Sequence, residues 1–258
     1  MKKVFYLFVV FAVLMTSASV LAYQSELPNS CEGIEDYAEY LRCDFLLNKK
    51  NNINSQIWPY SRCELIAPGE SKTAALDSNE ENKIYWNSSD TAVVSVSDDG
   101  VISALTLGTA EISAVDENCS TVFLSKIFST GKNADDCNKI TGEEYRDLLK
   151  CRYLLEAYKK EKNQFISPIT ELADIQLKKS KIIYLGPGKT DGMTWESSDP
   201  EIIEVSENGV VTALDYGLAT VKGYNSNGKE IFSVNIRCDE ISFLVEKYQL
   251  EEELSPVR

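Results

Sequence analysis

The stretch Trp86-Asn-Ser-Ser-Asp90, followed by Val93-Val-Ser-Val96, Gly100-Val-Ile-Ser-Ala104 and Gly108-Thr-Ala110, decides the fold of this chain. Short runs rich in β-branched residues alternate there with turns of Asp, Ser and Gly, and this pattern predicts antiparallel strands. In the turn Asp98-Asp99-Gly100, glycine stands where a tight hairpin needs a positive φ. Several such strands within about 70 residues predict a β-sandwich.

The same pattern occurs a second time further along the chain. Residues 86–114 align without a gap with residues 195–223, and twelve of the 29 aligned positions are identical. Both copies begin with a tryptophan, Trp86 and Trp195, followed after one residue by Ser-Ser-Asp. The chain therefore contains two copies of one structural unit.

Helix-forming segments flank the strand-rich blocks. Apolar residues at helical spacing predict helices at about 34–53, 142–162 and, shorter, 242–254. Thr141 and Glu144 would form a capping box at the start of the second helix. The apolar face of the last segment consists of Ile241, Leu244, Val245 and Tyr248. We expect these helices to cover the sandwiches or to space them apart.

The motif residues of both copies resemble the bacterial immunoglobulin-like group 2 domain. The second copy is similar at nearly every motif position, with Trp195-Glu-Ser-Ser-Asp-Pro200, Val205 to Ala213 and Gly217-Leu-Ala-Thr-Val221. Members of that family occur in invasin and intimin adhesins and as accessory modules of secreted enzymes. The resemblance therefore implies a sandwich fold and an exported setting, but no particular ligand.

The predicted architecture is mainly β with accessory helices: two tandem Ig-like β-sandwiches, each preceded by a helix, and a short C-terminal helix. The predicted segments are a signal peptide at 1–22, an N-terminal helical segment at 23–57, sandwich 1 at 58–130, a helical segment at 131–166, sandwich 2 at 167–237, and a C-terminal helix and tail at 238–258.

The N-terminus has the pattern of a secretory signal peptide. Lys2 and Lys3 precede the apolar run Val4 to Met15, and small residues lead to a cleavage site before Tyr23. No second apolar run reaches membrane length, so no transmembrane segment is expected after cleavage. We expect an exported protein that resides outside the cell, on its surface or in a periplasm.

The composition excludes several classes of function. Forty acidic residues stand against 26 basic ones, for a net charge of −14, and such a surface repels the phosphates of nucleic acids. The chain has no histidine, which removes the usual general base and the commonest metal ligand. The Ser-Ser-Asp triplets are therefore expected to close turns, and the tryptophans to fill the cores. Adjacent acidic residues point in different directions and predict no shared site.

Seven cysteines in an exported chain predict disulfides, because that environment is oxidising. Cys31, Cys137 and Cys238 each begin a Cys-x-x-Ile sequence, whereas Cys43 and Cys151 fall within predicted helices. No CxxC or zinc-ligand spacing is present, so we expect no metal and no cofactor.

The pairing of these cysteines follows from their place in the repeat. About nine helical residues would separate two cysteines of one helix by roughly 13 Å, whereas a disulfide needs α-carbons within about 7 Å. The expected pairs are Cys63–Cys119, Cys43–Cys137 and Cys151–Cys238, with Cys31 free or joining two chains. A sharp turn in the chain would allow Cys31–Cys43 and Cys137–Cys151 instead.

Without a catalytic constellation, the sequence favours a non-enzymatic exported repeat protein that contacts a protein or carbohydrate ligand at the bacterial cell surface, as an adhesion or binding module. The alternative is a structural spacer or assembly subunit of an envelope complex, in which Cys31 or an edge strand joins copies into a homo-oligomer. A third class, an enzyme that uses carboxylates alone, lacks a base to support it.

Overall fold

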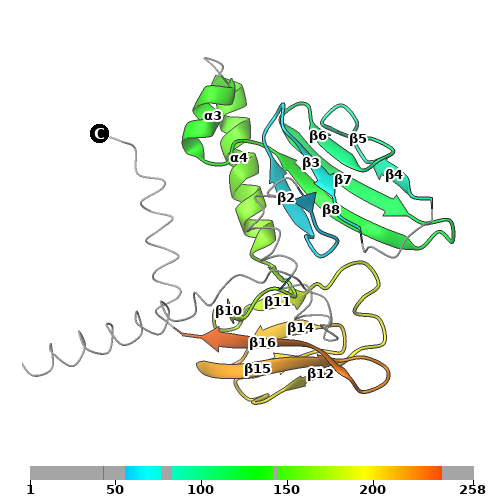
Figure 1. Cartoon of the computed structure of the whole chain (residues 1–258). Coiled ribbons are helices and arrows are strands. Elements are labelled where there is room, and N and C mark those ends of the chain that lie inside the picture. The colour runs from blue at the N-terminus through cyan, green and yellow to red at the C-terminus, as the bar shows by residue number, and fades with distance from the viewer. Residues whose placement is uncertain (1–42, 44–55, 77–82, 142–144, 240–258) are drawn as a thin grey trace, which may run out of the picture.

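The described part of the chain forms two β-sandwiches, with the helices α3 and α4 between them in sequence (Figure 1). The structure is a computed structural model that describes residue 43 and residues 56–76, 83–141 and 145–239, without the side chains of residues 140 and 141. Within these ranges every sheet has four strands, and the sheets pair into the two sandwiches.

The strands of the two sandwiches follow the same order. Sandwich 1 consists of β1 (Gln56–Ile57), β2 (Cys63–Ile66), β3 (Ser71–Ala74), β4 (Tyr85–Ser88), β5 (Val94–Val96), β6 (Val101–Ala104), β7 (Gly108–Val115) and β8 (Thr121–Ser129). Sandwich 2 consists of β9 (Phe165–Ile166), β10 (Leu172–Asp174), β11 (Ser180–Ile183), β12 (Thr194–Ser197), β13 (Ile203–Val205), β14 (Val210–Ala213), β15 (Gly217–Tyr224) and β16 (Glu230–Cys238).

The offset between the two copies, which aligns Trp86 with Trp195, extends over the whole sandwich. Every strand of sandwich 2 begins as many residues after its counterpart in sandwich 1 as Trp195 lies after Trp86. This holds from the pair β1 and β9 to the pair β8 and β16. The sheet orders also correspond: β1-β3-β6-β5 and β2-β8-β7-β4 in sandwich 1, β9-β11-β14-β13 and β10-β16-β15-β12 in sandwich 2. The predicted duplication is therefore confirmed, and each position in one sandwich has a direct counterpart in the other.

Most strand pairs are antiparallel, as the alternating pattern predicts, but the edge pairs differ. The strands of the motif block, β4 to β7, pair only in antiparallel register among the described residues. In contrast, β1 runs parallel to β3, and β2 runs parallel to β8. The corresponding edges of sandwich 2 are parallel as well. The edge strands β1 and β2 precede the motif block, in a part of the sequence that carries no hairpin signal.

The two tryptophans pack at the margin of the two cores, which confirms their expected role. Trp86 meets Phe123 edge to face at 5.3 Å between ring centroids, and Trp195 meets Phe232 at 5.8 Å. Gly100 has a φ of +77°, and a Cβ on it would lie 2.8 Å from the Trp86 ring. The predicted positive-φ turn is therefore also the place where the backbone makes room for this ring.

Two helices follow sandwich 1: α3 (Ala134–Thr141) and α4 (Tyr145–Lys162). The helix predicted at 142–162 corresponds to α4, while α3 was not predicted. Cys43 is helical, but the rest of the helix predicted at 34–53 and the one at 242–254 lie outside the described residues. Although α4 leads into sandwich 2, it packs along β2 and β8 of sandwich 1 (Figure 1).

Candidate functional site

The helices α3 and α4 are joined by a disulfide between Cys137 and Cys151, whose α-carbons are 5.6 Å apart. The expected pairs Cys43–Cys137 and Cys151–Cys238 are therefore wrong. The distance estimate assumed one continuous helix, but α3 ends at Thr141 and α4 begins at Tyr145. The chain turns between them, and this is the sharp turn that the alternative pairing required.

The expected pair Cys63–Cys119 is also wrong, because both cysteines are free. Cys63 pairs with Lys126 in the middle of β8, whereas Cys119 lies in the turn before β8 begins. At about 3.3 Å per residue, the intervening strand separates them by more than about 15 Å. Burial raises the pKa of the Cys63 thiol to about 11, so this thiol is protonated at neutral pH and is a poor nucleophile.

The remaining cysteines are placed as follows. Cys238 is free and buried at the end of β16, opposite Gly217. Its counterpart in sandwich 1 is Ser129, so Cys238 belongs to a strand, whereas Cys137 lies within helix α3. Cys43 is disulfide-bonded, and Cys31 lies outside the described residues.

The Ser-Ser-Asp triplets close turns, as expected. Ser88 Oγ donates to the carbonyl of Val94 at 2.6 Å, and the Ala92 amide donates to Asp90 Oδ1 at 3.0 Å. In the second copy the Glu201 amide donates to Asp199 Oδ1 at 3.2 Å. These side chains are engaged with the backbone around them, which is a structural role.

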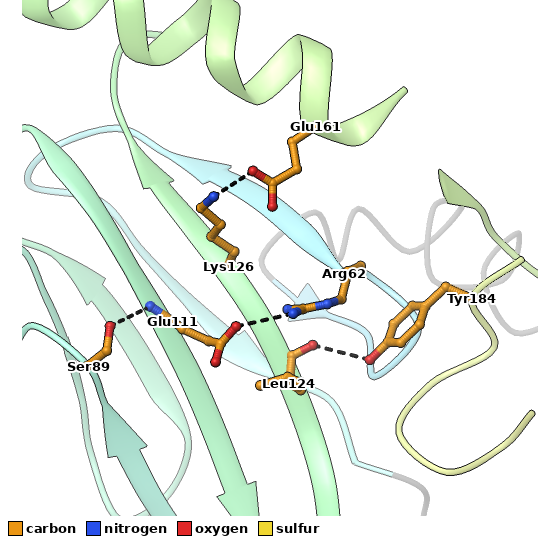
Figure 2. A network of polar contacts seen from close by, with 7 residues as sticks. All are labelled: Arg62, Ser89, Glu111, Leu124, Lys126, Glu161 and Tyr184. Carbon is orange, nitrogen blue, oxygen red and sulfur yellow. Dashed lines mark hydrogen bonds and ion pairs between the residues drawn. The ribbon is translucent and has the colours of Figure 1, made fainter. Parts of the chain in front are cut away.

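In sandwich 1, α4 covers part of the outer face of the sheet β2-β8-β7-β4. Figure 2 shows Lys126 of β8 pointing toward Glu161 of α4, and their charged groups are 2.6 Å apart. Phe128, the next outward residue of β8, is buried beneath Tyr158 of α4, with ring centroids 5.6 Å apart. This half of the face is therefore closed to a ligand.

Beside α4 the same face meets sandwich 2. Arg62 pairs with Glu111 at 3.2 Å, and Tyr184 of sandwich 2 donates from its hydroxyl to the carbonyl of Leu124 at 3.4 Å (Figure 2). Burial raises the pKa of Tyr184 to about 12, so its hydroxyl remains a hydrogen-bond donor at neutral pH. This hydrogen bond is a direct contact between the two sandwiches.

The corresponding face of sandwich 2 carries no such helix within the described residues. The buried Phe128 corresponds to Arg237, and Leu65 of β2 corresponds to Asp174. Arg237 Nε lies 2.7 Å from Asp174 Oδ1 and 3.3 Å from a carboxylate oxygen of Asp239. An apolar contact beneath a helix in sandwich 1 is thus replaced by a solvated ion pair in sandwich 2.

Two exposed leucines lie near this ion pair on the same face of the sheet. Leu218 of β15 lies opposite Arg237 and is 60% exposed, and Leu172 of β10 lies opposite Asn235 and is 47% exposed. Leu214 and Tyr216, which immediately precede β15, are exposed to a similar degree. We call this surface the open face; it consists of Leu172, Asp174, Leu218, Asn235 and Arg237.

The open face was not predicted from the sequence. Arg237 and the two leucines carry no motif, and single exposed apolar residues are common on protein surfaces. The one available signal was the repeat itself, because the repeat offset aligns an apolar pair, Leu65 and Phe128, with a charged one. Extending the alignment beyond its conserved block would have shown this exchange.

The described residues contain no group of three or more Cys, Asp or Glu side chains placed to hold a metal ion. Among the helices in the described part of the chain, none is long and apolar enough to cross a membrane.

Comparisons with known proteins find both sequence and structural likeness. An uncharacterized protein of Clostridium acetobutylicum is 26% identical over 154 residues, which are 59% of this chain and 13% of that protein. The chain thus spans about an eighth of the length of this curated relative. A GH10 xylanase from termite gut that contains a bacterial Ig-like domain is 24% identical over 27% of this chain and 18% of its own, with a TM-score of 0.23.

Two further solved structures show similarity at 14% identity. A C-terminal fragment of intimin, in complex with the intimin-binding domain of its translocated receptor, covers 60% of this chain and 50% of its own, with a TM-score of 0.20. The S-layer protein SbsC covers 61% and 20%, with a TM-score of 0.21. Residues 71–122, which contain β3 to β7 of sandwich 1, match the bacterial Ig-like domain (group 2).

Proposed function

We propose that this chain is an exported, non-enzymatic Ig-like protein that makes contacts at the bacterial cell surface, and that the open face of sandwich 2 is its contact surface. The observation that supports this proposal is a difference between the two copies at one pair of corresponding positions. Phe128, which is apolar and covered by α4 in sandwich 1, is replaced in sandwich 2 by the half-buried Arg237, which lies opposite the exposed Leu218. Exposed apolar side chains that lie together on one face are typical of interaction surfaces.

The chemistry of the open face favours a protein over a carbohydrate partner. Sugar rings stack on exposed aromatic side chains, whereas both Trp86 and Trp195 pack against the cores. The open face instead offers two leucines around Arg237, and arginine is enriched in protein interfaces. Its ion pairs are exposed and contribute little stability by themselves.

Ligand screening with and without an intact open face tests this proposal. The mature protein is used in pull-down from surface fractions and on a glycan array, together with the variants Leu218→Asp and Leu105→Asp. Leu105 is the matched control, because it is half exposed on sandwich 1. We expect a protein ligand that loses about tenfold or more in affinity with Leu218→Asp alone. Absence of any ligand, together with hydrolytic activity in a substrate panel, would overturn the proposal.

A second candidate function, a structural spacer, has an observation of its own. Helix α4 packs on sandwich 1 and continues after only two residues, Asn163 and Gln164, into β9 of sandwich 2. The Ile182 amide then donates to the carbonyl of Gln164 at 2.8 Å. A short, hydrogen-bonded connection of this kind keeps two domains at a fixed distance, which a spacer requires.

A further inference from the structure

Helix α4 carries a second apolar stripe on the side that faces away from sandwich 1. Tyr145, Leu149 and Tyr153 follow one another at intervals of four residues and therefore share one side of the helix. They are 72%, 49% and 73% exposed. The buried residues of α4, which lie on its other side, are Cys151, Leu154 and Leu155. A continuous row of exposed apolar side chains indicates a contact surface.

Basic residues flank this stripe on both sides. At 100° per residue, Arg146 and Lys150 lie along one flank and Arg152 along the other. None of the ion pairs among the described residues engages these three side chains. In a chain with a net charge of −14, this half of α4 is locally positive. The stripe therefore fits an amphipathic helix with acidic flanks.

The chain itself contains a segment with these properties, at residues 240–258, outside the described residues. Its sequence predicts a helix with Ile241, Leu244, Val245 and Tyr248 on one face. Glu240 and Glu251 fall along one flank of that face, whereas Glu252 falls within it and Glu246 on the opposite side of the helix. The apolar face of this segment and its acidic flank thus complement the apolar stripe and a basic flank of α4.

We propose that the exposed stripe of α4 binds the C-terminal segment 240–258 of the same chain. The segment follows directly on β16, so the contact is intramolecular, with an effective concentration that a separate partner must match. A second copy of α4 fits less well in this position, because it would bring two rows of basic side chains together. Docked in this way, the C-terminal segment joins the end of sandwich 2 to the helix that covers sandwich 1.

Trypsin cleavage after Lys247 in the full chain measures whether the segment is docked. Cleavage of a docked helix requires that it first detaches, so the rate follows the detached population. We expect Leu149→Asp to accelerate this cleavage about tenfold or more, and Leu105→Asp, at a leucine of equal exposure on sandwich 1, to leave it unchanged. Circular dichroism verifies that both variants are folded. Arg146→Glu combined with Lys150→Glu is expected to accelerate the cleavage as well, and more strongly at low salt.

Three results would overturn the proposal. The first is equally fast cleavage in the wild type and in Leu149→Asp. The second is acceleration by Leu218→Asp alone, which would place the segment on the open face. The third is protection that appears only at high protein concentration together with a doubled mass, which would show that the segment binds a second copy.

Discussion

At the scale of single residues, the two sandwiches keep backbone conformations more strictly than residue types. Gly69 has a φ of +86°, and its counterpart in sandwich 2 is Lys178, with a φ of +61°. A non-glycine residue in this region costs roughly 1–2 kcal/mol. The glycine that marks this turn in sandwich 1 is thus absent from sandwich 2, while the turn itself is retained.

Replacing two glycines of sandwich 1 distinguishes how much a positive φ and how much a close contact each lower the free energy of unfolding. A Cβ on Gly69 would meet nothing within 4 Å, whereas one on Gly100 would meet the Trp86 ring at 2.8 Å. We expect Gly69→Ala to lower the free energy of unfolding by about 1 kcal/mol and Gly100→Ala by about 2–4 kcal/mol, because overpacking adds to the backbone strain.

Urea unfolding followed by tryptophan fluorescence measures both glycine variants. Gly209→Ala is the comparison in sandwich 2, where the distance to the Trp195 ring is 3.2 Å, so its effect should lie between the other two. Equal losses for Gly69→Ala and Gly100→Ala would contradict the proposed role of the Trp86 contact.

At the scale of elements, the sequence predicted what depends on local pattern and missed what depends on distance. The strands of the motif block and the helix α4 follow from periodicity and turn residues. The break between α3 and α4 does not follow from local pattern, because the positions of Cys137 and Cys151 in the sequence do not show whether one helix or two helices contain them. Local pattern could not predict the open face either, since the exposure of a strand depends on whether another element covers it.

The disulfide between the two helices is expected to stabilise the cover on sandwich 1. Residues just after β8 contact Cys151: Thr130 Oγ1 donates to the carbonyl of Cys151 at 2.8 Å, and the Gly131 amide donates to Cys151 Sγ at 3.2 Å. For a loop of 14 residues, chain entropy predicts a loss of about 3 kcal/mol when both cysteines are replaced by alanine.

Chemical unfolding of the double variant, compared with Cys119→Ala, tests this value. Cys119 is free and exposed, so its replacement should change stability by less than about 0.5 kcal/mol. A large loss with Cys119→Ala would instead restore the pairing of Cys119 with Cys63.

At the scale of the whole molecule, α4 belongs to both sandwiches at once. It covers sandwich 1 through Glu161 and Tyr158 and reaches β9 after two residues. The hydrogen bond from Tyr184 to the Leu124 carbonyl closes the other side of the junction. A covalent connection and a non-covalent one therefore act together, and the arrangement should be rigid only while both are present.

Lengthening the covalent connection tests this rigidity. Insertion of Gly-Ser-Gly-Ser between Lys162 and Asn163 leaves both cores intact, but it replaces a two-residue connection with a flexible linker. A single hydrogen bond contributes only about 0.5–1.5 kcal/mol, so Tyr184 alone cannot hold the sandwiches together. We expect small-angle X-ray scattering to show a larger maximum dimension and a broader distribution of distances. The same insertion after Gly228, in the exposed turn between β15 and β16, should change neither. An unchanged scattering profile for the first insertion would show that the contact between the sandwiches suffices without the helix, and would remove the main support for a spacer role.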